Sequence, residues 1–157
     1  MRISAKADYA IRAVAELAAA GRVPDAGPWV KTESVSTVQN IPLPFLLNIL
    51  AELRTAELVR SRRGVDGGYQ LTRPPAQISV ADVIRAVDGP LANIAGARPE
   101  DLDYPGPATA LRDIWIALRA TMRSVLEQVT LADLAAGTLP DDVRGLLHGD
   151  DVWRARR

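Results

Sequence analysis

Three arginines, Arg60, Arg62 and Arg63, stand within four residues just before a glycine-rich run at 64–68. Apolar and polar residues alternate on both sides of that run, a pattern that predicts a β-hairpin with the arginines near its tip. A guanidinium is always charged, so it can pair with phosphate or enter a narrow minor groove. We therefore predict that Arg62, Arg63 and Gly64 contact DNA; the alternative is a solvated hairpin with incidental arginines.

Two short helices joined by a turn are expected before this hairpin. Thr32 is expected to cap the first, over 33–39, because its hydroxyl can accept a free backbone N–H. Pro42 suits the start of the second. That helix places apolar residues three and four apart on one face, which are Phe45, Leu46, Ile49, Leu50 and Leu53. A helix-turn-helix with a basic hairpin is a winged helix, and its usual role is DNA binding.

The second helix should read bases, but its first turn offers few hydrogen-bonding side chains. Asn48 is the best candidate, because its amide can pair with adenine, although a solvated polar residue is an equal alternative. Leu43 or Pro44 could touch a thymine methyl group. Four further residues are expected to contact phosphate and position the domain, namely Lys6, Lys31, Thr32 and Arg54.

Other elements follow from caps and stop signals. A first helix is expected over 5–20, capped by Ser4 and ended by Gly21. A short strand is expected beside the hairpin, at residues 29–31. Ser79 is expected to cap a helix over 80–87.

A long helix is expected over 108–128. Its apolar residues are spaced 4, 3, 4, 3 and 4 apart, at Leu111, Trp115, Leu118, Met122, Val125 and Val129. A period of about 3.5 is that of a seam between two helices, so we predict dimerisation here. The alternative is an ordinary stripe facing the chain's own core. A two-fold dimer would place two recognition elements on a palindromic site.

The expected fold is mostly α with a small β-wing: a winged helix-turn-helix plus a long C-terminal dimerisation helix. The 157 residues divide into a DNA-binding domain at 1–88 and a sensor-type loop without cysteines at 89–107. The dimerisation helix and a closing helix follow at 108–137, and a polar, flexible tail at 138–157.

Composition excludes several classes of protein. Net charge is zero, although residues 1–75 carry a net +3 (ten Lys/Arg, seven Asp/Glu) and the remainder a net −3 (nine and twelve). The chain has no cysteine, which excludes disulfides and thiolate metal sites. His148 is expected at the surface, and the acids of the 89–107 loop form a solvated rim rather than a metal site. Tyr104, Trp115 and Trp29 could line a small-molecule pocket, but aromatics at such spacing usually belong to a core.

The segment 41–51 is too short to span a bilayer and the N-terminus lacks a signal peptide, so the cytoplasm is expected. No nucleophile–base set indicates an enzyme.

Four segments in collinear order, 1–10, 61–71, 78–90 and 130–134, resemble the Rrf-type bacterial transcriptional regulators, the family that includes IscR, NsrR and CymR. In that family the arginine before the wing glycine contacts DNA, and Arg63 matches it. The resemblance also implies that the long helix forms the dimer interface.

Many members bind an iron–sulfur cluster through three cysteines in the loop that corresponds to 89–107, and their absence here implies no cluster. This sequence also departs from the family at the start of its recognition helix, where a hydroxyl or carboxylate is common. Glu57 replaces a usual glycine, which predicts a different ending for that helix.

We therefore expect a homodimeric, sequence-specific DNA-binding transcriptional regulator, a repressor on a palindromic operator, without a cofactor. Its signal would be a small-molecule effector or, as the cysteine-free CymR-like branch implies, a metabolic enzyme. The rival hypothesis is a protein-interaction module that uses the winged helix as a scaffold. Salt-sensitive binding to double-stranded DNA would separate the two.

Overall fold

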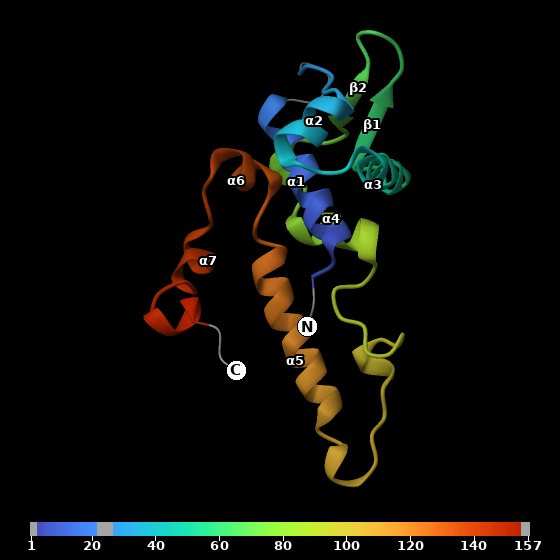
Figure 1. The fold of residues 1–157 in the computed structure, drawn as a ribbon. Helices are drawn as coiled ribbons and strands as arrows, with labels where there is room; N and C mark the ends of the chain where they lie inside the picture. The colour runs from blue at the N-terminus through green and yellow to red at the C-terminus, as the bar shows by residue number, and fades with distance from the viewer. Residues whose placement is uncertain (1–2, 22–26, 155–157) are drawn as a thin grey trace.

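The computed structural model describes residues 3–21 and 27–154, and it confirms a mostly helical chain with a two-stranded wing (Figure 1). Residues 22–26 and the last three residues of the expected tail, 155–157, lie outside the described residues. The helices and strands are, in order, α1 (Ala5–Ala20), α2 (Thr32–Gln39), α3 (Leu43–Thr55), β1 (Val59–Arg62), β2 (Gly68–Leu71), α4 (Val80–Asp88), α5 (Leu111–Leu126), α6 (Leu131–Ala136) and α7 (Asp141–Gly145). Short 3₁₀ helices lie at Pro75–Gln77, Pro99–Asp101, Gly106–Ala108 and Asp150–Trp153.

Helix α1 is the centre of the core and packs against α3, α4 and α6. Its bounds are those predicted: the Ser4 hydroxyl accepts the Ala7 N–H at 2.9 Å, and the Gly21 N–H donates to the Leu17 carbonyl at 3.1 Å. Its buried face consists mostly of small side chains, which lets neighbouring helices approach closely; these are Ala7, Ala10, Ala13, Val14, Leu17 and Ala18.

The helix-turn-helix forms as predicted, with two corrections. Thr32 is not the cap of α2 but its first residue; Lys31 occupies the cap position and makes no side-chain cap hydrogen bond. Phe45 does not join the buried face of α3, because its side chain is 63% exposed while Leu46, Ile49, Leu50 and Leu53 are buried. The turn is made by Asn40, which takes the left-handed conformation at φ 50°.

The end of α3 differs from the prediction in an informative way. Glu57 adopts φ 58°, the left-handed conformation that glycine prefers. The Leu58 N–H donates to the Leu53 carbonyl and the Glu57 N–H to the Arg54 carbonyl, both at 3.0 Å. These two bonds form a Schellman motif, the usual glycine-terminated helix end. Helix α3 therefore ends as it would with glycine at position 57. Glutamate adopts the left-handed conformation there at a cost in conformational free energy.

The wing is an antiparallel hairpin in which Val59 pairs with Leu71 and Arg62 with Gly68. The expected strand at 29–31 is reduced to one bridge, in which Val30 and Tyr69 exchange backbone hydrogen bonds at 3.0 and 2.9 Å. A Cβ on Gly68 would lie 2.3 Å from the Val30 carbonyl oxygen. Only glycine therefore permits this approach.

Helix α4 and helix α6 pack on α1, whereas α5 extends away from the winged helix and projects downward in Figure 1. Ser79 caps α4 through a reciprocal capping box with Asp82, as predicted for its start. Helix α5 is shorter than the predicted 108–128. The expected polar tail contains α7, whose Val143 is buried, and it exposes apolar side chains at Leu146, Leu147, Val152 and Trp153.

We predict that Glu57→Gly raises the free energy of unfolding by about 1 kcal/mol relative to Glu57→Ala, because alanine keeps the left-handed strain and glycine relieves it. Urea denaturation of both variants tests this, and Glu57→Ala also controls for loss of the carboxylate. Equal stability of the two variants would show that the conformation at position 57 carries no strain.

Candidate nucleic-acid interface

Six of the eight predicted DNA-binding residues line one cleft of about 320 Å³ between the start of α2, the last turn of α3 and the wing. They are Lys31, Thr32, Arg54, Arg62, Arg63 and Gly64. The start of α2 also presents backbone N–H groups without helical acceptors, which favours an anion. Glu33 lines the cleft as well, so the positive charge is concentrated but not unopposed.

Trp29 holds two of the wing arginines. The guanidinium carbons of Arg60 and Arg62 lie 5.4 and 5.9 Å from the centroid of its ring, within the range of a cation–π contact. Arg60 also donates to the Gln70 side chain at 2.9 Å, whereas Arg62 and Arg63 are exposed. Sequence reasoning missed this role of Trp29, although the predicted pairing of 29–31 with the wing already placed the ring near the arginines.

Two further cations brace the wing against the helices. The Lys31 ammonium donates to the Val65 carbonyl at the tip. The Arg54 guanidinium donates to the Ser61 hydroxyl at 3.2 Å. Both side chains remain exposed, so each orders the hairpin while leaving donors for a ligand.

The other two predicted residues lie outside the cleft. Asn48 is exposed on α3. Lys6 is half-buried and forms ion pairs with Glu52 at 3.0 Å and Asp88 at 4.0 Å. Its charge is therefore already compensated, which weakens the prediction of a phosphate contact.

The six residues predicted to form the dimer seam on the long helix do not all lie on one surface. Trp115, Leu118 and Met122 line a groove of about 620 Å³ with residues of α1, α4 and the segment 90–95. Leu111 and Val125 are half-buried on α5. Val129 follows the end of α5 and is buried in the core of its own chain, so a partner would reach little of it.

The loop at 89–107 is held against one flank of α5. The Trp115 indole N–H donates to the Tyr104 hydroxyl at 3.2 Å, and Arg119 pairs with Glu100. A backbone hydrogen bond and the Arg119 guanidinium lower the pKa of Glu100, so its carboxylate stays charged to lower pH than a free glutamate, and the ion pair is lost as pH falls through the lowered value. Of the three aromatic residues that could line a small-molecule pocket, Tyr104 and Trp115 are therefore in contact, whereas Trp29 lies beside the wing.

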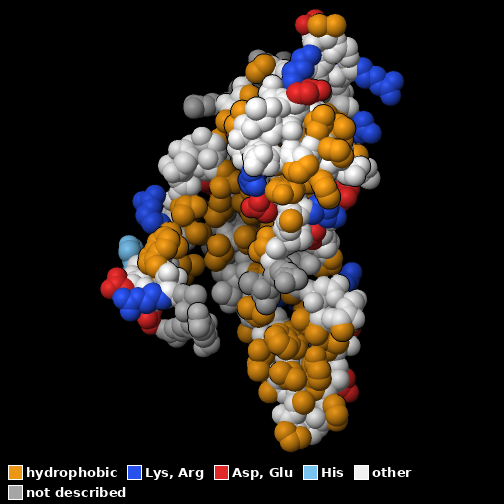
Figure 2. All heavy atoms as spheres, in the orientation of Figure 1, with side chains coloured by type: hydrophobic (Ala, Val, Ile, Leu, Met, Phe, Trp, Pro, Cys, Tyr) orange, Lys and Arg blue, Asp and Glu red, His pale blue; other side chains and the backbone are white. Residues whose placement is uncertain are grey.

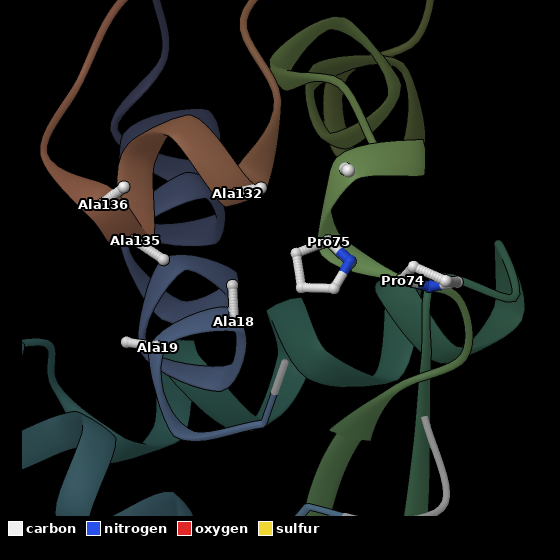
Figure 3. A pocket seen from close by; sticks show the side chains of 8 residues that line it. Ala18, Ala19, Pro74, Pro75, Ala132, Ala135 and Ala136 are labelled. Carbon is white, nitrogen blue, oxygen red and sulfur yellow. The ribbon is translucent and has the colours of Figure 1, made fainter. Parts of the chain in front are cut away.

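A separate pocket of about 280 Å³ lies between the end of α1, the segment 74–76 and α6 (Figure 3). Alanine and proline side chains line it, so it offers no side-chain group for hydrogen bonding or acid–base chemistry.

Among residues 3–21 and 27–154, no group of three or more His, Cys, Asp or Glu side chains is placed to hold a metal ion. Over the same residues no helix has the length and apolar character needed to cross a membrane. The helix-turn-helix followed by a two-stranded wing defines a winged-helix protein, with cations gathered in the cleft beside the wing.

Comparison with known proteins places this chain among regulators. The family model described as "Rrf2: Iron-dependent Transcriptional regulator" matches residues 3–137, and the chain belongs to this family of bacterial helix-turn-helix transcriptional regulators. It is therefore not an enzyme. The predicted resemblance is confirmed.

Individual relatives cover nearly the whole chain. The "Putative HTH-type transcriptional regulator Rv1287" of Mycobacterium tuberculosis is 55% identical over 156 residues, which are 99% of this chain and 92% of that protein. The regulator CymR of Bacillus subtilis is 35% identical over 138 residues, which are 88% of this chain and 92% of that protein. Its solved structure, described as the global cysteine regulator, matches with a TM-score of 0.72 over 88% of this chain and 98% of that one. The solved structure of IscR from T. potens matches with a TM-score of 0.68 and 27% sequence identity. The match covers 98% of this chain and 97% of the IscR chain.

The family description names iron, but an iron–sulfur cluster held by cysteine thiolates does not fit the residues of this chain. Iron–sulfur clusters are held chiefly by cysteine thiolates, and the chain has none. The loop at 89–107 instead contacts α5 through the Trp115–Tyr104 hydrogen bond and the Arg119–Glu100 ion pair.

We predict that Arg63→Ala weakens DNA binding by about 1–3 kcal/mol and lowers its salt slope by about 1, because one exposed guanidinium is lost from the cleft. Titrations at two salt concentrations test this. Arg98→Ala, which removes an exposed arginine far from the cleft, is the control and should bind normally. Identical curves for Arg63→Ala and wild type would contradict the assignment.

We also predict that protein purified without oxygen is colourless and contains well under one iron atom per chain. The measurements are a visible spectrum and an iron assay. A visible-absorbing cluster at one per chain would require ligands other than thiolates.

Proposed function

We propose that this protein is a homodimeric transcriptional repressor that binds a palindromic operator without an iron–sulfur cluster. The observation that carries the proposal is the cleft in which Lys31, Arg54, Arg62 and Arg63 converge. In this arrangement α3 enters a major groove and the wing, with Arg63 at its tip, reaches the adjacent minor groove. The protein would act on the chromosome in the cytoplasm.

The surface of α5 supports the homodimer. None of its 16 residues, all of them described, is buried in the single chain. Ile114 and Leu118, one helical turn apart, are 53% and 38% exposed. An isolated helix of this length is marginal in water, so an apolar helix without a buried face gains most from a partner. A second copy of α5 seated along the groove beside Trp115, Leu118 and Met122 would cover these side chains.

The proposed signal is a small-molecule effector or a metabolic enzyme rather than a cluster. Because the solved structure of CymR is described as the global cysteine regulator of B. subtilis, genes of sulfur metabolism are the first regulon to examine. The absence of cysteine supports a signal read without thiolate chemistry.

A protein-interaction module remains the second candidate, favoured by one observation. The helix-turn-helix exposes apolar side chains, with Val38 67% and Phe45 63% exposed. Figure 2 shows apolar side chains over this region beside Lys and Arg side chains. Such a patch can also bind protein.

Selection of bound sequences from a random duplex pool separates the two candidates. A regulator should yield a consensus with two inverted half-sites about one helical turn apart, and affinity should fall steeply with salt. An interaction module should yield no consensus.

We predict that Leu118→Glu gives a monomeric or poorly folded protein with weakened DNA binding. A two-fold interface would bring the two carboxylates into apolar surroundings, and burying each charge costs several kcal/mol. Sedimentation velocity and a DNA titration test this.

The matched control is Ala120→Glu, which adds the same charge to an exposed position on the other side of α5. It should remain dimeric. If Leu118→Glu stays a soluble dimer with normal DNA affinity, the dimer is built from a different surface.

A further inference from the structure

The outward side of α3 is largely apolar. Its buried side consists of Leu46, Ile49, Leu50 and Leu53. The opposite side carries Pro44, Leu47, Asn48 and Ala51, all exposed, and the Leu47 side chain is 46% exposed. About half of Leu47 therefore stays in water, where exposed apolar area is unfavourable.

This outward side is continuous with the cationic cleft. Leu47 and Arg54 are seven residues apart on α3, so they lie two turns apart on one side of the helix. Arg54 lines the cleft and donates to Ser61 of the wing. A duplex whose phosphates meet Arg54 and Lys31 would therefore present its groove to the row that contains Leu47.

The chemistry of this row matches one feature of DNA. The thymine C5-methyl is the apolar group that standard bases present in the major groove. Leucine and proline side chains cannot hydrogen-bond a base edge, but they can cover a methyl group. Asn48, next to Leu47, can pair with the adenine that accompanies a thymine.

We propose that Leu47, supported by Pro44, is a specificity-determining residue that reads thymine methyl groups, so that the operator half-site contains thymine at fixed positions. This inference rests on the proposed DNA-binding function and deepens it. It moves the predicted methyl contact from Leu43, which is half-buried, to Leu47. DNA is favoured over a protein partner because Arg54, on the same side of α3 as Leu47, lines the cleft together with three other cations, Lys31, Arg62 and Arg63.

Replacing thymine by deoxyuridine tests the inference, because it removes the methyl group and leaves every hydrogen-bonding group in place. The consensus duplex from the random pool is synthesised with each thymine replaced in turn. Wild-type protein should bind about fourfold more weakly at one or two positions, the factor expected for one methylene-sized group. Leu47→Ala should bind the thymine and deoxyuridine duplexes equally.

Phe45→Ala is the matched control. Phe45 is an exposed apolar residue of the same helix, but it lies seven residues before Glu52 on the side that faces Lys6. This variant should retain the fourfold preference for thymine. An unchanged melting temperature of Leu47→Ala would show that its effect is not unfolding, as expected for an exposed side chain.

The contrary outcomes are distinct. A clear, salt-sensitive consensus with equal binding of thymine and deoxyuridine at every position overturns the inference and leaves the proposed function intact. A thymine preference that survives in Leu47→Ala, or disappears in Phe45→Ala, assigns the methyl contact to another residue. Failure to select any duplex contradicts the function and the inference together.

Discussion

The backbone pairing of Val30 with Tyr69 is the constraint on which the candidate interface depends. It joins the segment before α2 to the wing, and it can form only because Gly68 has no Cβ to meet the Val30 carbonyl. The pairing places Trp29 beside Arg60 and Arg62, and it brings Lys31 to the wing tip. A free hairpin would lose conformational entropy whenever its arginines met a ligand. Here much of that ordering is already done by the fold.

Most of the winged helix could be predicted because its signals are local. Ser4 and Ser79 mark helix starts by direct hydrogen bonds, and alternation around the glycine run identifies the hairpin. The errors arose where tertiary geometry decides. Phe45 fits the apolar periodicity of α3 but lies at the margin of the buried face, and no local pattern reveals which neighbours reach that margin. Six of the cleft residues could be anticipated one by one, whereas the role of Trp29 depends on its contacts with Arg60 and Arg62, about thirty residues further along the chain.

Glu57 and α5 show two ways in which this chain departs from a self-sufficient fold. At Glu57 the backbone keeps a glycine-like conformation because the hydrogen bonds of Leu58 and Glu57 to α3 outweigh a local strain. Along α5 the loop at 89–107 contacts one flank through Tyr104 and Glu100, and no side chain of the helix becomes buried. A helix that is fixed at one flank and apolar on another is suited to a second copy of itself.

In the proposed complex, the distribution of charge and apolar surface separates the task of holding DNA from the task of reading its sequence. With zero net charge over the chain, long-range attraction to DNA is weak, and four cations, Lys31, Arg54, Arg62 and Arg63, are gathered at one cleft. Contacts of those cations with phosphate give affinity that falls with salt and carries no sequence information. The outward row of α3 adds few hydrogen-bonding groups, so in the proposed complex discrimination there would come from Asn48 and from apolar contact. Apolar contact is not screened by salt, and it therefore preserves sequence preference under conditions that weaken phosphate binding.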